Sequence, residues 1–309
     1  MKNLKITTPY RNLYEKIKGN IGVYFRDKKR KAIRKKYLAS IKARPTNENV
    51  PFTAHMMLCK RDLEMAMCSA KAFNQVMDDA MRFRFHDDGS LDESDVAFVE
   101  KHVPGTKVIL RKEADERAEK ELGKYPKILE YRRNQIMSLK IIDVTIWGEG
   151  KRFCYVDSDV LFFHKPEFFI KALQDELPKN YFNKDIQNVY MQTPEEIEAF
   201  LGIRPCEKAN AGLWVMNKAD INLDTIESWL NNPGFKKSLY GYTLDQTFIS
   251  MLANNSEVGA EHLPTTYDVN FYKKAEDSVC KHYVGAIRHG YELEGLNYLM
   301  NVDHGHFSQ

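Results

Sequence analysis

The order of apolar and polar positions predicts a chain that alternates between strands and helices. Short runs that are apolar, or that alternate apolar with polar, are typical of buried and half-buried strands. Such runs cover residues 54–59, 81–85, 107–110, 153–156, 160–163 and 213–216. After the first run, Leu63, Met67, Ala70 and Phe73 recur at the spacing that places them on one face of a helix. We therefore expect strands and helices to follow one another along the chain.

Further helices are expected where the spacing is helical and capping residues precede it. Residues 94–99 follow Ser90 and Ser94, either of which can cap a helix N-terminus. A long helical region follows the next strand, and Pro126 breaks it before it ends near Trp147. Strands that alternate with helices indicate an α/β fold with a central, mostly parallel sheet flanked by helices.

Charge divides the chain into two parts. The 309 residues carry a net charge of +3, but residues 1–50 hold 15 Lys and Arg against 3 Asp and Glu, whereas the remainder holds 31 against 40. The polar segment 43–49 is rich in turn-forming residues and reads as a linker. We therefore predict a basic helical arm with its linker at residues 1–50 and a mildly acidic α/β domain at residues 51–309.

The basic arm is compatible with two environments. Its Lys and Arg residues are interleaved with aromatic and aliphatic ones, as in segments that lie on an anionic membrane. The same pattern suits a helix that packs one side on the body and leaves its charges in water. Peripheral membrane contact through residues 1–45 therefore stays open beside the packed helix. Nucleic acid is not an expected partner, because no nucleic-acid motif accompanies the charge.

Hydropathy and cysteine usage indicate in which cellular compartment the protein is expected. No run of roughly 18 apolar residues is present, and the N-terminus lacks the apolar core of a secretory signal. The five cysteines form no C-x-x-C pair, which argues against a disulfide framework or a zinc site. We expect a cytoplasmic protein, either free or held at the inner face of the membrane by its arm.

The strongest chemical signal is an acidic pair where a buried strand ends. Asp157 and Asp159 follow the apolar run Phe153–Val156 and precede another, Val160–Phe163. Residues i and i+2 of an extended chain point to the same side, so both carboxylates can reach one cation. Hard oxygen ligands suit Mg²⁺ or Mn²⁺, and ligands of open α/β sheets bind at the carboxyl ends of strands. The alternative is an Asp-Ser-Asp turn or a helix N-cap, which the strand-like residues after the pair disfavour.

Three further segments follow this pair in an order that a known family shares. They are Asn210-Ala211-Gly212, Asp245-Gln246, and His282 with Arg288 six positions later. Together with Asp157-Ser158-Asp159, they resemble the motifs of GT-A nucleotide-sugar transferases, in particular the glycogenin-like and lipopolysaccharide galactosyltransferase-like enzymes of glycosyltransferase family 8. The resemblance covers about residues 51–290. The ordered set is much more specific than any single motif.

The resemblance implies a metal and diphosphate site. Asp157, Asp159 and His282 would hold a divalent ion, Mn²⁺ or Mg²⁺. Arg288, and Lys140 upstream of the acidic pair, would contact the donor diphosphate. Two of these positions depart from the family, because Lys140 stands in place of an arginine and Arg288 in place of a lysine. Arginine still suits a diphosphate, which it can bind through two hydrogen bonds. The family's base pocket is not recognisable near the first strand.

The resemblance also implies a sugar site. Asn210, Ala211 and Gly212 would face the donor sugar, and Asp245 and Gln246 would lie beside the reacting carbon. An asparagine offers amide donors and acceptors to sugar hydroxyls, and a glycine lets the backbone approach closely. Each match also has an ordinary alternative. The first segment could be a plain turn before a strand, and the aspartate could be the N-cap of a helix over residues 246–252.

The sequence thus predicts a metal-dependent glycosyltransferase with a GT-A catalytic domain. By resemblance, it would transfer a hexose from a nucleotide-diphosphate sugar, a UDP-sugar, to a glycan or lipid-linked saccharide acceptor. The pair Asp245-Gln246 resembles that of retaining enzymes, so we expect the anomeric configuration to be retained, although Asp245 as a general base would give inversion. Two other functions stay open. One is a haloacid-dehalogenase-like phosphatase, which also places Asp-x-Asp after a buried strand, and the other is a non-catalytic nucleotide-sugar binding protein.

Overall fold

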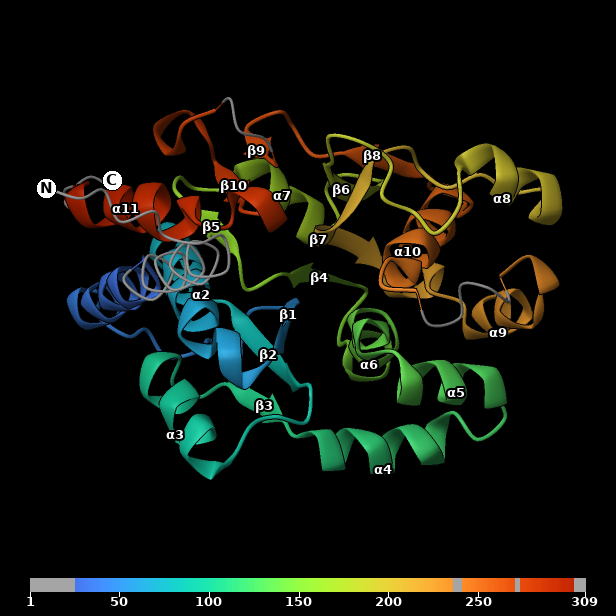
Figure 1. Ribbon diagram of the computed structural model, residues 1–309, viewed down its shortest axis with the longest axis horizontal. Helices are drawn as coiled ribbons and strands as arrows, with labels where there is room; N and C mark the ends of the chain where they lie inside the picture. Colours follow the sequence, from blue (N-terminus) through green and yellow to red (C-terminus); the bar gives the residue numbers. More distant parts are fainter. Residues whose placement is uncertain (1–25, 236–240, 270–272, 303–309) are drawn as a thin grey trace, which may run out of the picture.

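A seven-stranded sheet runs through the centre of the molecule (Figure 1). The computed structural model describes residues 26–235, 241–269 and 273–302. The strand order is β3-β2-β1-β4-β7-β6-β8, and β7 alone in this sheet is antiparallel to its neighbours. The strands are β1 (Thr53–Leu58), β2 (Arg82–Asp87), β3 (Lys107–Ile109), β4 (Arg152–Val156), β6 (Asn180–Lys184), β7 (Ala209–Asn217) and β8 (Ala260–His262). The predicted mostly parallel sheet is confirmed.

A smaller sheet continues from the carboxyl end of β4. It has the order β5-β10-β9, with β5 (Val160–Phe162), β9 (Tyr267–Asp268) and β10 (Cys280–His282). Strand β5 is antiparallel to β10. The chain therefore leaves the large sheet after β4 and enters the small one after a turn of three residues, 157–159. That junction holds the acidic pair.

Helices cover both faces of the large sheet. Successive side chains of β4 point alternately to the helices on one face and to those on the other. Cys154 and Val156 belong to the apolar cluster that includes α2, whereas Phe153 and Tyr155 belong to the cluster that includes α5, α6 and α10. This is the period of two expected for a strand buried on both faces. The helices are α2 (Leu63–Val76), α3 (Glu93–His102), α4 (Arg111–Glu121), α5 (Pro126–Asn134), α6 (Ile142–Trp147), α7 (Glu167–Leu173), α8 (Pro194–Leu201), α9 (Leu223–Asn231), α10 (Leu244–Asn254) and α11 (Asn297–Asn301).

One capping prediction is wrong. The N-cap of α3 is Asp92, rather than Ser90 or Ser94. Its carboxylate accepts hydrogen bonds from the backbone N–H groups of Ser94 and Asp95, and the Asp95 side chain accepts one from the backbone N–H of Asp92. The reciprocal pair satisfies more of the free N–H groups at the helix start than one serine hydroxyl could.

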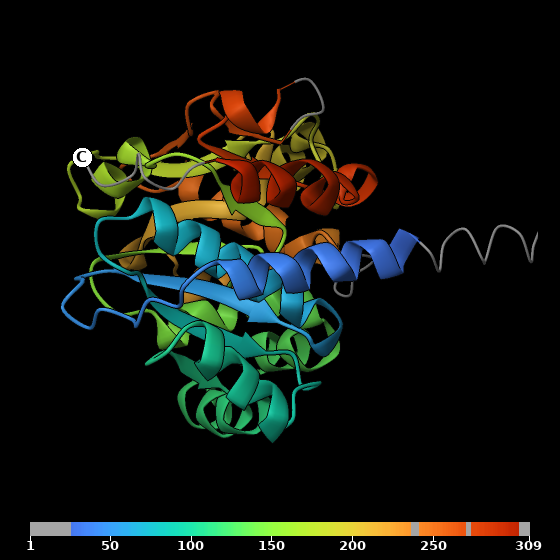
Figure 2. The ribbon, with the colours of Figure 1, turned by 90° about the vertical axis from the view of Figure 1, so that its left-hand side faces the viewer.

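The described part of the basic arm packs on the body. Residues 26–40 are helical and lie beside α2 and the C-terminal helices (Figure 2). Tyr37, Leu38 and Ile41 are buried in the apolar cluster of α2. The following segment is also bonded to the body, since Arg44 donates to the carbonyl oxygens of Met77 at 2.7 Å and Asp78 at 2.6 Å.

The division of the chain at residue 50 stays a prediction. Residues 1–25 of the arm lie outside the described part of the chain. None of the helices that the structure describes combines the length and the apolar character needed to cross a membrane.

Candidate metal centre and ligand cavity

The acidic pair occupies the turn between β4 and β5. The backbone N–H of Asp157 donates to the carbonyl of Gly212 at 2.7 Å, and that of Val160 donates back to the Asp157 carbonyl at 3.1 Å. The Asp-Ser-Asp turn is therefore real, and it coexists with a cluster of ligand atoms instead of replacing it. Both carboxylates are partly buried, so their charges meet a reduced dielectric.

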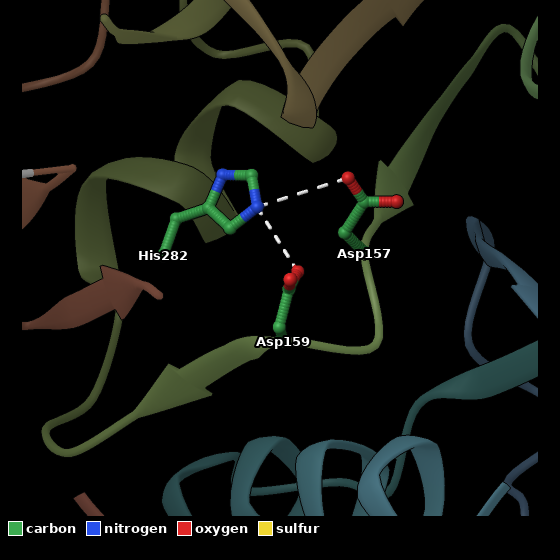
Figure 3. A group of neighbouring side chains, drawn as sticks. All are labelled: Asp157, Asp159 and His282. Carbon is green, nitrogen blue, oxygen red and sulfur yellow. Dashed lines mark hydrogen bonds and ion pairs between the residues drawn. The ribbon is translucent and has the colours of Figure 1, made fainter. Parts of the chain in front are cut away.

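Strand pairing brings His282 to this turn. Strand β10 pairs with β5 in a register that sets His282 opposite Val160, next to Asp159. Its Nε2 lies 3.0 Å from Oδ1 of Asp159 and 3.8 Å from Oδ2 of Asp157, and the imidazole points between the two carboxylates (Figure 3).

The three side chains fit a divalent cation. Each offers a ligand atom, and these atoms lie within 4.8 Å of one another. Neighbouring ligands of an octahedral ion with bonds near 2.1 Å are about 3 Å apart, so a small rearrangement would suffice. Two carboxylates and one imidazole also suit manganese and magnesium by ligand type.

Asn210 fixes the orientation of the imidazole. Its Oδ1 lies 2.8 Å from Nδ1 of His282 and accepts from the backbone N–H of Gly212 at 2.9 Å. Its Nδ2 donates to a carboxylate oxygen of Asp185 at 2.8 Å. Because a carboxylate only accepts, the amide cannot be turned around, and Nδ1 of the imidazole must carry the hydrogen. In neutral His282 the lone pair is therefore on Nε2, which faces the acids, as a metal ligand requires.

Gly212 leaves the space in which these groups meet. A Cβ atom at this position would lie 2.0 Å from Cε1 of His282 and 2.8 Å from Oδ2 of Asp157. No real side chain tolerates such distances, so any other residue would displace the imidazole or the carboxylate. The close approach expected at this glycine is thus made by the metal-site side chains.

The charges around the acids act on one another. Burial lowers the pKa of His282, but the carboxylates of Asp159 and Asp157 outweigh it and raise the pKa above its ordinary value. Burial alone would raise the pKa of Asp159, but the imidazole of His282 beside the carboxylate outweighs burial and lowers this pKa below its ordinary value. Lys140 donates to Oδ2 of Asp157 at 2.8 Å and is itself buried. The apo cluster therefore favours a protonated imidazole, which a metal ion would have to deprotonate.

A cavity of about 540 Å³ opens beside the cluster. It is lined by nine of the ten residues predicted for the site: Lys140, Asp157, Asp159, Asn210, Ala211, Gly212, Asp245, Gln246 and His282. Strand β7 runs antiparallel to β4, so its first residues lie beside the end of β4, and α10 begins next to them. The structure brings these nine together, and their individual roles stay predictions.

The two residues predicted at the reacting carbon lie at the start of α10. Thr243 occupies the N-cap position, so Asp245 is inside the first turn and is not the cap. Burial raises the pKa of Asp245 to about 6, although nearby Lys140 opposes the shift. Gln246 accepts from the backbone N–H of Ala211 and donates to the carbonyl of Val189, both at 3.2 Å. Its amide is therefore held in one orientation.

Arg288 lies outside this cavity. Its Nη2 donates to Asp62 at 2.7 Å, and its Nε is 3.6 Å from Oδ2 of Asp159. Asp62 and two further polar partners, Tyr155 and Asp185, were not predicted from the sequence. Tyr155 donates to Asp157 at 2.9 Å and could have been found, since it lies two residues before that acid in a strand. Asp185 directly follows β6, a strand that was not predicted.

Solved structures with a similar fold include several glycosyltransferases. Mouse xyloside xylosyltransferase 1 matches with a TM-score of 0.50 at 15% identity, over 75% of this chain and 96% of that one. The galactosyltransferase LgtC, solved with donor and acceptor sugar analogues, matches with a TM-score of 0.47 at 15% identity over 76% and 87%. Core-mannan synthase A of Aspergillus fumigatus, in its Mn/GDP form, matches at 0.46 and 11% over 73% and 75%. No protein-family model and no curated protein sequence matches the chain. The chain has the GT-A fold, as predicted.

Proposed function

We propose that this protein is a metal-dependent glycosyltransferase that uses a nucleotide-diphosphate sugar as donor. The observation that carries the proposal is the cluster of Asp157, Asp159 and His282, which lines a 540 Å³ cavity at the carboxyl end of β4. Ligands of open α/β sheets bind at this edge. A bound Mn²⁺ or Mg²⁺ would supply positive charge to the donor diphosphate as the nucleotide leaves. UDP is the nucleotide that the family resemblance favours.

The buried cation of the cavity supports the same chemistry. Lys140 lies against Asp157, where its ammonium group can also approach a leaving diphosphate. Arg288 lies 3.6 Å from Asp159, and we expect its guanidinium group to reach the same diphosphate. Both cations are partly or fully withdrawn from water, which strengthens their effect on a developing negative charge.

The sugar end of the cavity offers neutral and acidic hydrogen-bonding groups. Asp185, Asp245 and Gln246 line it, and all can bind sugar hydroxyls. We propose that the held amide of Gln246 faces the anomeric carbon and that the acceptor attacks from the side of the leaving group, with retention. An amide cannot take up a proton, so the donor's own phosphate oxygen would accept the acceptor proton.

The mouth of the cavity suits an acceptor. Ile186 and Tyr242 line the cavity and are 55% and 70% exposed, so both offer apolar surface where the cavity opens to solvent. An exposed tyrosine ring can stack against a saccharide and keep its hydroxyl in water. This supports a glycan or lipid-linked saccharide as acceptor.

The phosphatase alternative has less support. The acidic pair of such a phosphatase normally follows the first strand of its fold, whereas Asp157 and Asp159 follow the fourth strand that the structure describes, β4. A screen of nucleotide-sugars with Mn²⁺ tests the proposal by thermal shift and by turnover. Transfer or slow hydrolysis of one donor supports it. Binding without turnover supports the binding-protein alternative, and phosphate release from sugar phosphates supports the phosphatase. NMR of the product linkage decides between retention and inversion.

A further inference from the structure

A second cavity, lined mainly by basic side chains, adjoins the metal cluster. It has a volume of about 660 Å³ and shares no lining residue with the first cavity. The two approach each other where Arg288, which lines the second, faces Asp159, which lines the first. One wall comes from the helix of residues 26–40, and another from residues 61–65 at the start of α2. The six cationic side chains that line it are Lys28, Arg30, Lys31, Arg34, Arg61 and Arg288.

Some of these cations hold the helix in place. Glu292, in the segment η7 (Tyr291–Leu296), is fully buried and pairs with Arg30 at 2.8 Å and with Arg34. Arg34 also contacts Glu64 of α2 at 3.3 Å. A buried carboxylate needs such partners, because an unpaired charge there would be very costly. These two arginines are therefore committed to anchoring the helix on the body.

Two other cationic side chains of the same helix form no ion pair with the residues that the structure describes. Lys28 and Lys31 line the cavity and are exposed, and neither has an acidic partner among the residues that the structure describes. The anchoring pairs fix the helix that carries them. The cavity therefore presents two free ammonium groups at a defined position beside the metal cluster.

The side chains that line the two cavities differ in the sign of their charge. This difference indicates which way round a bound donor would lie. The first cavity carries four acids, Asp157, Asp159, Asp185 and Asp245, against one lysine, Lys140, so beyond the reach of a bound metal ion it suits sugar hydroxyls better than phosphates. The second cavity carries six cations against two acids and would attract phosphates. A nucleotide-sugar has a neutral sugar at one end and an anionic diphosphate behind it. Its charge thus matches a sugar in the first cavity and a nucleotide toward the second.

We propose that the helix of residues 26–40 forms a wall of the donor site and that Lys28 and Lys31 contact the phosphates of the nucleoside diphosphate. This rests on the proposed function and adds to it a segment that lies outside the region of family resemblance. The volume is within the usual range for a ligand of this size, about 300–1,000 Å³. Met65, which is buried at the wall, offers apolar surface for a base.

The test compares two charge reversals on one helix of the full-length protein. The variant Lys28→Glu/Lys31→Glu changes the wall of the cavity. Its matched control, Lys29→Glu/Lys35→Glu, changes two exposed lysines of the same helix that do not line it. Affinities for UDP, GDP and pyrophosphate are measured by calorimetry with Mn²⁺ present, and melting temperatures confirm folding. We expect the first variant to bind UDP or GDP on the order of tenfold more weakly and the control to bind within about twofold of the wild type.

Each other outcome is informative. If both variants weaken binding equally, or if neither does, the helix is not a wall of the donor site, although metal-dependent binding by the wild type would still support the proposed function. If the wild type itself binds no nucleoside diphosphate, both proposals fail. Pelleting with phosphatidylserine vesicles separates a lipid phosphate from a nucleotide phosphate. Loss of vesicle binding by the first variant with unchanged nucleotide affinity would overturn the inference in favour of membrane contact.

Discussion

The two cavities that meet at Asp159 and Arg288 are built in different ways. The first is formed by strand ends and the start of α10, and backbone pairing between strands fixes the position of its side chains. The second owes one wall to a single helix that ion pairs and a few apolar side chains hold on the surface. The groups proposed for catalysis, whose relative positions matter, are thus held by the sheet. The basic groups proposed to attract phosphates are held by the helix of residues 26–40. Substitutions in the first cavity should therefore abolish turnover, whereas substitutions in the second should weaken ligand affinity in proportion to the charge that they remove.

The largest expected effect is at the acids of the first cavity. Asp157→Asn and Asp159→Asn each remove a ligand charge, so turnover should fall at least about a thousandfold while circular dichroism shows a folded protein. Asp224→Asn, a change at an exposed acid of α9, serves as the control. Full turnover in excess EDTA would refute the metal assignment.

Asp245 should impose a pH dependence on stability. Its pKa is about 6 in the folded protein against 3.8 when exposed, so the folded state binds the proton more tightly. The resulting stability is fully present below pH 3.8 and is lost as the pH rises through 6, a loss of about 3 kcal/mol. Asp245→Asn does not ionise. Its stability relative to the wild type should therefore rise between pH 4 and pH 7 in urea denaturation of the metal-free protein, and a constant difference would argue against a buried, strained carboxylate.

Glu292→Gln tests the anchoring of the second cavity. It leaves Arg30 and Arg34 facing a neutral amide, and since both arginines are partly exposed we expect a loss of about 2 kcal/mol in unfolding free energy, less than for a fully buried pair. Nucleoside diphosphate affinity should fall several-fold with the displaced helix, whereas Mn²⁺ affinity should not change. A parallel loss of Mn²⁺ affinity would mean that the two cavities are not independent.

The smallest effect is expected at Asn210, which positions the imidazole. Asn210→Ala frees His282 to rotate, and Mn²⁺ affinity should fall about tenfold. Asn231→Ala, at an exposed asparagine of α9, is the matched control. If Mn²⁺ affinity is unchanged and only the donor KM rises, the residue contacts the sugar instead.

The sequence predicted those parts of the fold and site that local patterns determine. The strand β4 was clear because residues 153–156 are apolar on both faces, and β2 was clear because Phe83 and Phe85 alternate with Arg82 and Arg84. The acidic pair was clear because it interrupts an apolar run. Strand β6 has the mixed sequence Asn-Tyr-Phe-Asn-Lys, so neither it nor Asp185 after it was recognised. The bond between Arg288 and Asp62 joins residues 226 apart, and no local pattern records it. The cap of α3 was misassigned because both serines and the aspartate between them are good caps.

The antiparallel pairing of β5 with β10 also sets the order of events in folding. The contact between His282 and Asp159 closes a loop of 123 residues, and that between His282 and Asn210 closes one of 72. Closing such loops is slow compared with forming the local helices between them. A nascent chain would therefore present both carboxylates well before the imidazole leaves the ribosome. A metal ion that needs all three ligands, Asp157, Asp159 and His282, would bind only late in folding. It would therefore stabilise only chains in which β10 has already paired with β5.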